Sequence, residues 1–273
     1  SLRSPGSSFK PIVYATAFEQ GPWAPGSTLF DLRTDFGDKT RAYIPKNYDG
    51  KFHGPVSIRD ALANSYNVPA VKMLALIQKE PVIAKAKKLG MTTLTDPEHY
   101  GLSLAIGGAD VRLLELTGAY GVFANNGAIN APAAIGKITQ KGNVVYDHKP
   151  ESQVVFQPQV AYQINSILSD NKARTPIFGP NSALIVKGHT AAVKTGTSQA
   201  YRDAWTIGYT PSIVAGVWVG NNDNRPLRAG SAGAMAAAPI WNAFLSRVLA
   251  NTPNEPFAAP SGFEVVTVDS VTG

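Results

Sequence analysis

The 273-residue chain contains no cysteine. This absence excludes disulfide bonds, thiol catalysis and cysteine-ligated zinc sites. Charged residues are also scarce, at 16% of the chain. No run of about 18 or more apolar residues could span a bilayer, and no signal peptide is recognisable. Any membrane anchor is therefore expected to lie outside this sequence.

The net charge is +6, but the basic residues are scattered, and only Lys85, Lys87 and Lys88 form a local group. Nucleic-acid-binding proteins more often concentrate basic residues on one face, interleaved with aromatic residues. We therefore expect no nucleic-acid partner and interpret the excess charge as a solvated surface. A weaker alternative is attraction to an anionic polymer or a membrane surface.

Hydrophobic residues make up 44% of the chain, enough for a large core in one large domain or two small ones. Ser57 is expected to cap a helix that ends near Asn64. Three extended runs late in the chain predict an antiparallel meander, and an earlier pair of short runs predicts a hairpin. The fold class is therefore α+β, with helices packed on an antiparallel sheet. The expected helices cover residues 7–18, 57–64, 69–77, 81–89, 111–124, 158–168 and 239–249, the hairpin 135–146, and the meander 191–197, 204–209 and 213–219.

Both ends of the chain resemble cut ends, because few domains place a reactive motif so close to a true N-terminus. We expect one domain over residues 1–256. Residues 257–273 are expected to form a connection that ends in a short strand, with the sequence Phe-Glu-Val-Val-Thr-Val.

Ser7-Ser8-Phe9-Lys10 is the first motif with chemical potential. Ser7 and Lys10 share a helix face, so a lysine amine could activate the serine hydroxyl if burial and nearby positive charge lower its pKa. Ser7 would also lie at a helix N-terminus, where the dipole favours negative charge. Alone the motif is weak, since an N-cap serine with a surface lysine has the same pattern.

Ser65-Tyr66-Asn67 falls between two predicted helices, where serine and asparagine are ordinary turn residues. Ser65 could pass a proton between Lys10 and a leaving group, and Asn67 could bind a substrate amide. As an isolated string this motif carries little information.

Lys194-Thr195-Gly196-Thr197 lies on a predicted strand. Gly196 inside a strand often marks the close approach of a ligand or another backbone. Lys194, with the hydroxyls of Thr195 and Thr197, could hold a substrate carboxylate. The backbone N–H groups of Thr197 and Ser7 could form an oxyanion hole.

The three motifs together are more specific, because this ordered set is the signature of penicillin-binding proteins and class A β-lactamases. The chain resembles the class A (bifunctional) penicillin-binding proteins in particular, over essentially its whole length. The similar segments, besides the motifs, are Pro5-Gly6, Arg59-Asp60-Ala61-Leu62, Asn67-Val68-Pro69-Ala70, residues 119–127, Asp203-Ala204-Trp205, Gly208-Tyr209-Thr210-Pro211 and residues 217–221.

The resemblance implies a penicillin-binding, serine β-lactamase-like fold and D,D-transpeptidase activity. Ser7 would attack a stem peptide that ends in D-Ala-D-Ala, release the terminal D-Ala and pass the acyl group to an amine. β-Lactam antibiotics would trap Ser7 as an ester. Lys10 would be the base and Ser65 a relay, and the carboxylate site would lie around Lys194. No cofactor or metal is expected.

The family's fold has sheet strands before the Ser-x-x-Lys helix, whereas almost nothing precedes Ser7 here. We expect these N-terminal strands to be missing or to come from a separate chain, in which case the fragment would be inactive or poorly stable alone. The resemblance also implies an upstream glycosyltransferase domain, a membrane anchor and a place on the extracytoplasmic face of the bacterial membrane.

Two other classes of protein would use the same pocket. A serine β-lactamase would need an efficient deacylating base, and no convincing Glu-x-x-Leu-Asn segment is found. A non-catalytic β-lactam-binding sensor is disfavoured by the intact Ser7, Lys10 and Lys194. A Ser-His-Asp hydrolase is a more distant alternative, because none of the four histidines lies in a nucleophile-elbow context and His189, close before Lys194, is interpreted as a loop residue.

Overall fold

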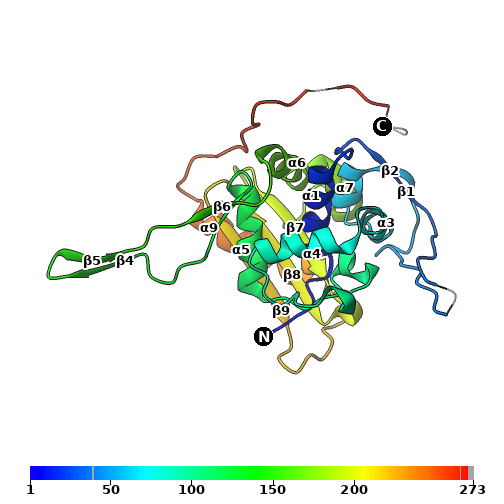
Figure 1. Cartoon of the computed structure of the whole chain (residues 1–273), viewed down its shortest axis with the longest axis horizontal. Helices are drawn as coiled ribbons and strands as arrows, with labels where there is room; N and C mark the ends of the chain where they lie inside the picture. Colours follow the sequence, from blue (N-terminus) through cyan, green and yellow to red (C-terminus); the bar gives the residue numbers. More distant parts are fainter. Residues whose placement is uncertain (39, 265, 270–273) are drawn as a thin grey trace.

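A three-stranded antiparallel sheet forms the centre of the molecule (Figure 1). The computed structural model describes residues 1–38, 40–264 and 266–269. Strands β7 (Ala192–Thr197), β8 (Asp203–Tyr209) and β9 (Val214–Gly220) pair in sequence order, with Trp205 opposite Trp218. Every residue of β8 is buried, while β9 is mostly half-buried. The predicted meander is therefore confirmed.

Helices cover both faces of this sheet. Helix α1 (Lys10–Gln20) is buried along almost its full length and packs between α3, α4 and α6. On the opposite face, α9 (Ala238–Val248) inserts Trp241 and Leu245 against β8 and β9. The α+β class, with helices packed on an antiparallel sheet, is thus confirmed. The other helices are α2 (Ile58–Ala63), α3 (Asn67–Ile77), α4 (Lys79–Lys88), α5 (Leu113–Ala124), α6 (Pro158–Leu168), α7 (Asn171–Phe178) and α8 (Gly233–Ala236).

Local signals explain several helix boundaries. The Ser57 side chain accepts a hydrogen bond from the Asp60 N–H group, as predicted for an N-cap, and α2 ends before Asn64. Helix α3 begins at Asn67, two residues before the predicted start at Pro69, because proline suits the first helical turn without having to begin it. Helix α7 was not predicted, because Pro176 lies inside it and proline normally argues against a helix interior.

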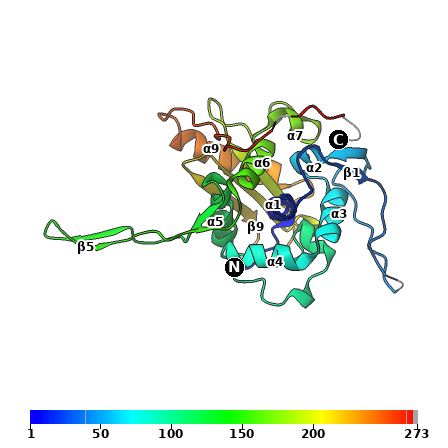
Figure 2. The ribbon, with the colours of Figure 1, turned by 45° about the horizontal axis from the view of Figure 1, so that its top comes forward.

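The described residues also form three small two-stranded sheets outside the main sheet. β1 (Thr28–Asp31) pairs with β2 (Gly54–Ser57), and β3 (Ala128–Asn130) pairs with β6 (Ser152–Val154). The predicted hairpin is present as β4 (Lys137–Gln140) and β5 (Asn143–Asp147), and it extends away from the rest of the molecule (Figure 2). The remaining elements of the described residues are the short 3-10 helices η1 (Gly6–Phe9), η2 (Pro97–His99), η3 (Leu102–Ile106) and η4 (Gln199–Tyr201).

The two ends of the chain add little to the main sheet. Arg3 makes an isolated antiparallel bridge with Val111, and residues 1–5 form no strand of the main sheet. The predicted C-terminal strand falls partly on residues 265 and 270–273, which lie outside the described residues; residues 263–264 and 266–269 are in no strand. Within the described part of the chain, no helix has the length and apolar character to cross a membrane.

Candidate active site

A cleft of about 1240 Å³ runs between the end of β7, the start of η1 and the turn before α3. All three sequence motifs reach it. Five of the predicted residues line the cleft: Ser7, Ser65, Asn67, Thr195 and Thr197. Lys10, Lys194 and Gly196 lie buried beside it. The fold therefore brings together eight residues from three motifs that are distant in the sequence.

Ser7 is half-buried in η1, which runs directly into α1. Ser7 and Lys10 thus lie on consecutive turns, as the sequence predicts. A close backbone contact fixes η1 against β7, because a Cβ atom on Gly6 would lie 2.3 Å from the Thr197 carbonyl oxygen. Gly6 also has a φ of +54°, which glycine tolerates without strain. Only glycine fits here, and the Ser7 and Thr197 backbones are consequently neighbours.

Lys10 is fully buried, and its ammonium group makes hydrogen bonds to the second motif. Nζ donates to the Ser65 carbonyl oxygen at 2.6 Å and to Asn67 Oδ1 at 2.7 Å, and it lies 3.4 Å from Ser65 Oγ. Burial, and then the charge of Lys194, hold the pKa of Lys10 well below its usual value. Among the described residues, Ser7 is not one of its hydrogen-bond partners.

Ser65 is held in an uncommon backbone conformation, with φ at +63°. Backbone hydrogen bonds from Ser65 N to Leu62 O and from Tyr66 N to Ala61 O close the turn around it. Its hydroxyl points to Lys194, whose Nζ donates to Ser65 Oγ at 2.7 Å. A strained residue that is retained at a cleft is typical of a functional position.

Lys194 is buried on β7, and Nζ also donates to its neighbour's carbonyl, Thr195 O, at 3.0 Å. Burial lowers the pKa of Lys194 to about 7. Two lysines with lowered pKa values therefore contact one serine hydroxyl. Such a cluster can move a proton near neutral pH and can present a positive charge to an anion at the cleft.

The two threonines differ in their surroundings. Thr197 Oγ1 accepts a hydrogen bond from Gly233 N at 3.1 Å, at the beginning of α8, and it keeps its own proton to donate. Thr195 is nearly buried, at 7% exposure, and faces the cleft. Gly196 between them approaches η1 closely, because a Cβ there would lie 2.2 Å from Pro5 O. The expected close backbone approach at Gly196 is confirmed.

Residues 1–246 match the family model described as penicillin binding protein transpeptidase domain. The chain belongs to this family. It is 35% identical to penicillin-binding protein 1A of Aquifex aeolicus, covering 98% of this chain and 36% of that protein. It is also 35% identical to penicillin-binding protein 1C of Escherichia coli, covering 94% of this chain and 31% of that protein. The resemblance to class A penicillin-binding proteins is confirmed.

Solved structures support the same assignment. Penicillin-binding protein 1A from Haemophilus influenzae superposes with a TM-score of 0.90 at 25% identity, over all of this chain and 46% of that one. PonA1 from Mycobacterium tuberculosis in complex with penicillin V superposes with a TM-score of 0.79 at 25% identity, over 97% and 73% of the two chains. The penicillin-binding fold is therefore confirmed, and the chain spans about a third of the curated relatives' length.

Sequence reasoning missed a polar cluster at one wall of the transpeptidase cleft. Asp203 accepts hydrogen bonds from Ser198 Oγ at 2.6 Å and from the Trp218 indole at 2.9 Å. Arg3 lies over the Trp218 ring, 5.1 Å from its centroid. Arg3, Ser198 and Asp203 all line the cleft. The Asp-Ala-Trp string marked a family resemblance but gave no sign of these contacts.

Two tyrosines were also missed. Tyr48, from the β1–β2 connection, and Tyr201, in η4, make an edge-to-face contact with ring centroids 6.4 Å apart. Both line the transpeptidase cleft, although they are far apart in the sequence. An exposed tyrosine in a turn is a common feature, so no sequence signal could have paired them.

Proposed function

We propose that this domain is a peptidoglycan D,D-transpeptidase that works through an acyl-enzyme on Ser7 and is inhibited by β-lactam antibiotics. The observation that carries the proposal is the buried pair Lys10 and Lys194, which share the Ser65 hydroxyl in the cleft that Ser7 also lines. A neutral lysine is a competent general base, and the lowered pKa of Lys10 supports that role.

In the acylation step, Ser7 Oγ forms a bond to the carbonyl carbon of the penultimate D-Ala. The Ser7 proton passes to the neutral amine of Lys10, a contact that is expected to tighten when substrate binds. The C–N bond to the terminal D-Ala then breaks, and Ser65 relays the proton to the departing amine. An acceptor amine on a neighbouring strand attacks the ester, loses its proton to the same relay and frees Ser7.

Charge placement supports the substrate class. Lys194 would hold the terminal carboxylate of the stem peptide together with the hydroxyls of Thr195 and Thr197. The neighbouring backbone N–H groups of Ser7 and Thr197 would stabilise the oxyanion of the tetrahedral intermediate. Asn67, which lines the cleft, would bind a substrate amide. No metal or cofactor has a part in this chemistry.

The proposal extends to the surroundings of the domain. Because the curated relatives are much longer, we infer an upstream glycosyltransferase domain and a membrane anchor in the whole protein. A separate chain that carries N-terminal strands is the alternative. The substrate is cell-wall material, so the domain would act on the extracytoplasmic face of the bacterial membrane.

Substrate turnover tests the proposal. The domain is incubated with a stem peptide that ends in D-Ala-D-Ala and with an acceptor amine, and products are followed by mass spectrometry. We expect released D-Ala and a cross-linked product from the natural sequence and neither from Ser7→Ala. Cross-linking that persists in Ser7→Ala would contradict the proposal. A chain that binds penicillin stably without cross-linking would be a sensor.

A further inference from the structure

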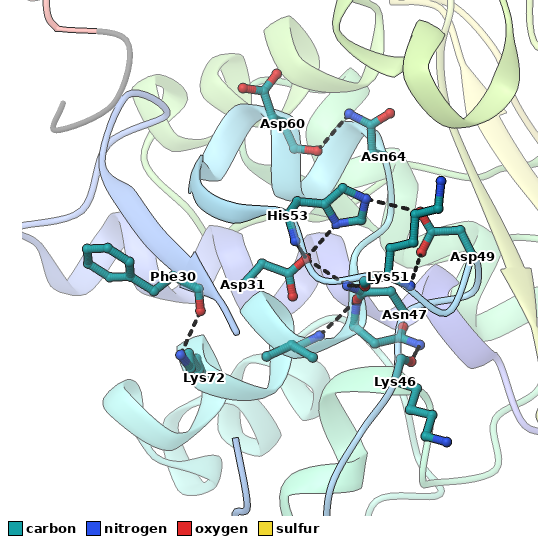
Figure 3. Close-up of polar contacts among 12 residues, drawn as sticks. Phe30, Asp31, Lys46, Asn47, Asp49, Lys51, His53, Asp60, Asn64 and Lys72 are labelled. Carbon is teal, nitrogen blue, oxygen red and sulfur yellow. Dashed lines mark hydrogen bonds and ion pairs between the residues drawn. The ribbon is translucent and has the colours of Figure 1, made fainter. Parts of the chain in front are cut away.

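Figure 3 shows the polar contacts of the β1–β2 connection, which link His53 through Asp31 to Asn47. His53 lies between two carboxylates. Its Nδ1 is 2.6 Å from Asp31 Oδ2, and its Nε2 is 3.0 Å from Asp49 Oδ2. The imidazole also stacks on Tyr66, the residue after Ser65, with ring centroids 4.0 Å apart. His53 therefore contacts both the connection and the second motif.

Asp31 is the centre of this chain of contacts. It is fully buried at the end of β1, and its Oδ2 accepts hydrogen bonds from His53 N at 3.0 Å and Asn47 Nδ2 at 2.7 Å. Its other oxygen, Oδ1, has no hydrogen-bond partner within the described chain. A buried carboxylate with an unpartnered oxygen costs stability. The hydrogen bond from Asn47 is the contact that connects this carboxylate to the site.

Asn47 connects Asp31 to the first turn of α3. Its Nδ2 donates to Asp31 and to Lys51 O at 2.8 Å, which leaves Oδ1 facing the first turn of the helix. That oxygen accepts from Asn67 N at 2.7 Å. The N-cap residue of α3, Tyr66, makes no side-chain cap. The same oxygen of Asn47 accepts from Val68 N at 3.3 Å, so a side chain about 20 residues away in sequence satisfies two backbone N–H groups that a helix start leaves free.

Asn67 completes the path to the base. Its Nδ2 donates to Lys46 O at 2.7 Å, so its Oδ1 is directed to Lys10 Nζ at the same distance. The segment that contains Lys46 and Asn47 therefore fixes both the backbone and the side-chain amide of Asn67. A shift of this segment would move an acceptor that holds the Lys10 amine.

We propose that His53 is a positioning residue for acylation: by its hydrogen bond to Asp31 it fixes Asn47, and through Asn47 it places Asn67 and the amine of Lys10. This inference rests on the proposed function. His53 does not line the cleft and makes no hydrogen bond to Ser7 within the described residues. Its effect is geometric, and misplacement of a base by about an ångström costs on the order of a hundredfold in rate.

Two substitutions separate the two hydrogen bonds of the imidazole. In His53→Asn the side-chain amide can occupy the place of Nδ1 and keep the bond to Asp31. In His53→Gln the longer amide can occupy the place of Nε2 and keep only the bond to Asp49. Both variants lose the stacking on Tyr66, so a difference between their acylation rates does not come from that loss.

The test measures acylation by a fluorescent penicillin under stopped flow, separating the limiting acylation rate from the initial binding constant. We expect His53→Asn to stay within about threefold of the natural rate and His53→Gln to fall about tenfold or more, with binding little changed. His99→Ala is the control, because His99 pairs with Asp96 at 3.0 Å on the surface and does not line the cleft. Its rate should not change.

A double-mutant cycle provides a second test. Asn47→Ala should slow acylation by a factor similar to that of His53→Gln, and the two together should be no slower than the worse single variant, because they act in series. Equal rates for His53→Asn and His53→Gln, or multiplicative effects in the cycle, would overturn the inference while the proposed function stands. A natural sequence that is not acylated at all would overturn both.

Discussion

The Nζ atom of Lys194 lies 2.7 Å from the Oγ atom of Ser65. This contact joins the third motif to the second across the cleft, and Lys10 approaches the same hydroxyl from the other side at 3.4 Å. Two buried amines cannot both carry a full charge at this separation without a large cost. The pair is therefore expected to carry less than two full positive charges near neutral pH, because both pKa values are lowered.

The pH dependence of acylation follows from this pair. The rate should rise as Lys10 loses its proton, at a pH well below the usual lysine range, and should fall as Lys194 loses the charge that attracts the carboxylate, near pH 7. We expect a bell-shaped profile of the second-order acylation constant between pH 5 and 9, measured at constant ionic strength. In Lys194→Arg, any remaining activity should lack the basic limb, since arginine stays charged. If the fall of the rate at high pH is unchanged in that variant, a group other than Lys194 causes it.

Stability should also depend on pH because of these lysines. Their pKa values are lower in the folded than in the unfolded state, so the unfolded state binds more protons between about pH 7 and 10. The free energy of unfolding should therefore increase with pH over this window. Above it, buried tyrosines with raised pKa values, such as Tyr120 and Tyr209, oppose the trend.

Urea unfolding at pH 7, 8 and 9 measures this slope. In Lys194→Met the increase with pH should be smaller, because one of the two titrating amines is gone. An equally steep increase in that variant would show that Lys194 does not contribute.

The close approach of β7 to η1 predicts a severe effect of Gly196→Ala. The added Cβ would lie 2.2 Å from Pro5 O and 2.9 Å from Ser8 Oγ, and a backbone oxygen cannot turn away as a flexible side chain can. We expect the domain to lose about 1–3 kcal/mol of unfolding free energy from overpacking. Penicillin acylation should fall by about a hundredfold, because the added Cβ would push η1, and Ser7 with it, away from β7.

Gly101→Ala is the matched control, since a Cβ there has no atom within 4 Å and its φ of −99° suits alanine. It should leave both stability and acylation unchanged. Full acylation in Gly196→Ala would mean that the contact between β7 and η1 does not set the position of Ser7.

Much of the fold could be predicted because its signals are local. The Ser57 cap, the stop after residue 124 and the extended run of β8 each depend on neighbours in sequence. The β1–β2 pairing was missed because a 22-residue connection separates its strands, and no short-range signal fixes such a register.

The candidate site divides in the same way. Ser7, Lys10 and Lys194 were predicted because their types and order form a recognisable pattern. Asn47 and His53 could not be found from sequence, because their importance lies in contacts with Asp31 and Asn67 that only the tertiary structure creates. An isolated histidine or asparagine in a loop has no pattern to distinguish it.

The most direct test of the central claim is an intact-mass time course with a penicillin, followed by peptide mapping of the adduct. We predict one stable adduct per chain, located on Ser7 and absent from Ser7→Ala although that variant remains folded. Rapid loss of the adduct with release of hydrolysed drug would instead identify a β-lactamase. An adduct on any other residue, or none on folded protein, would contradict the assignment of Ser7 as the nucleophile.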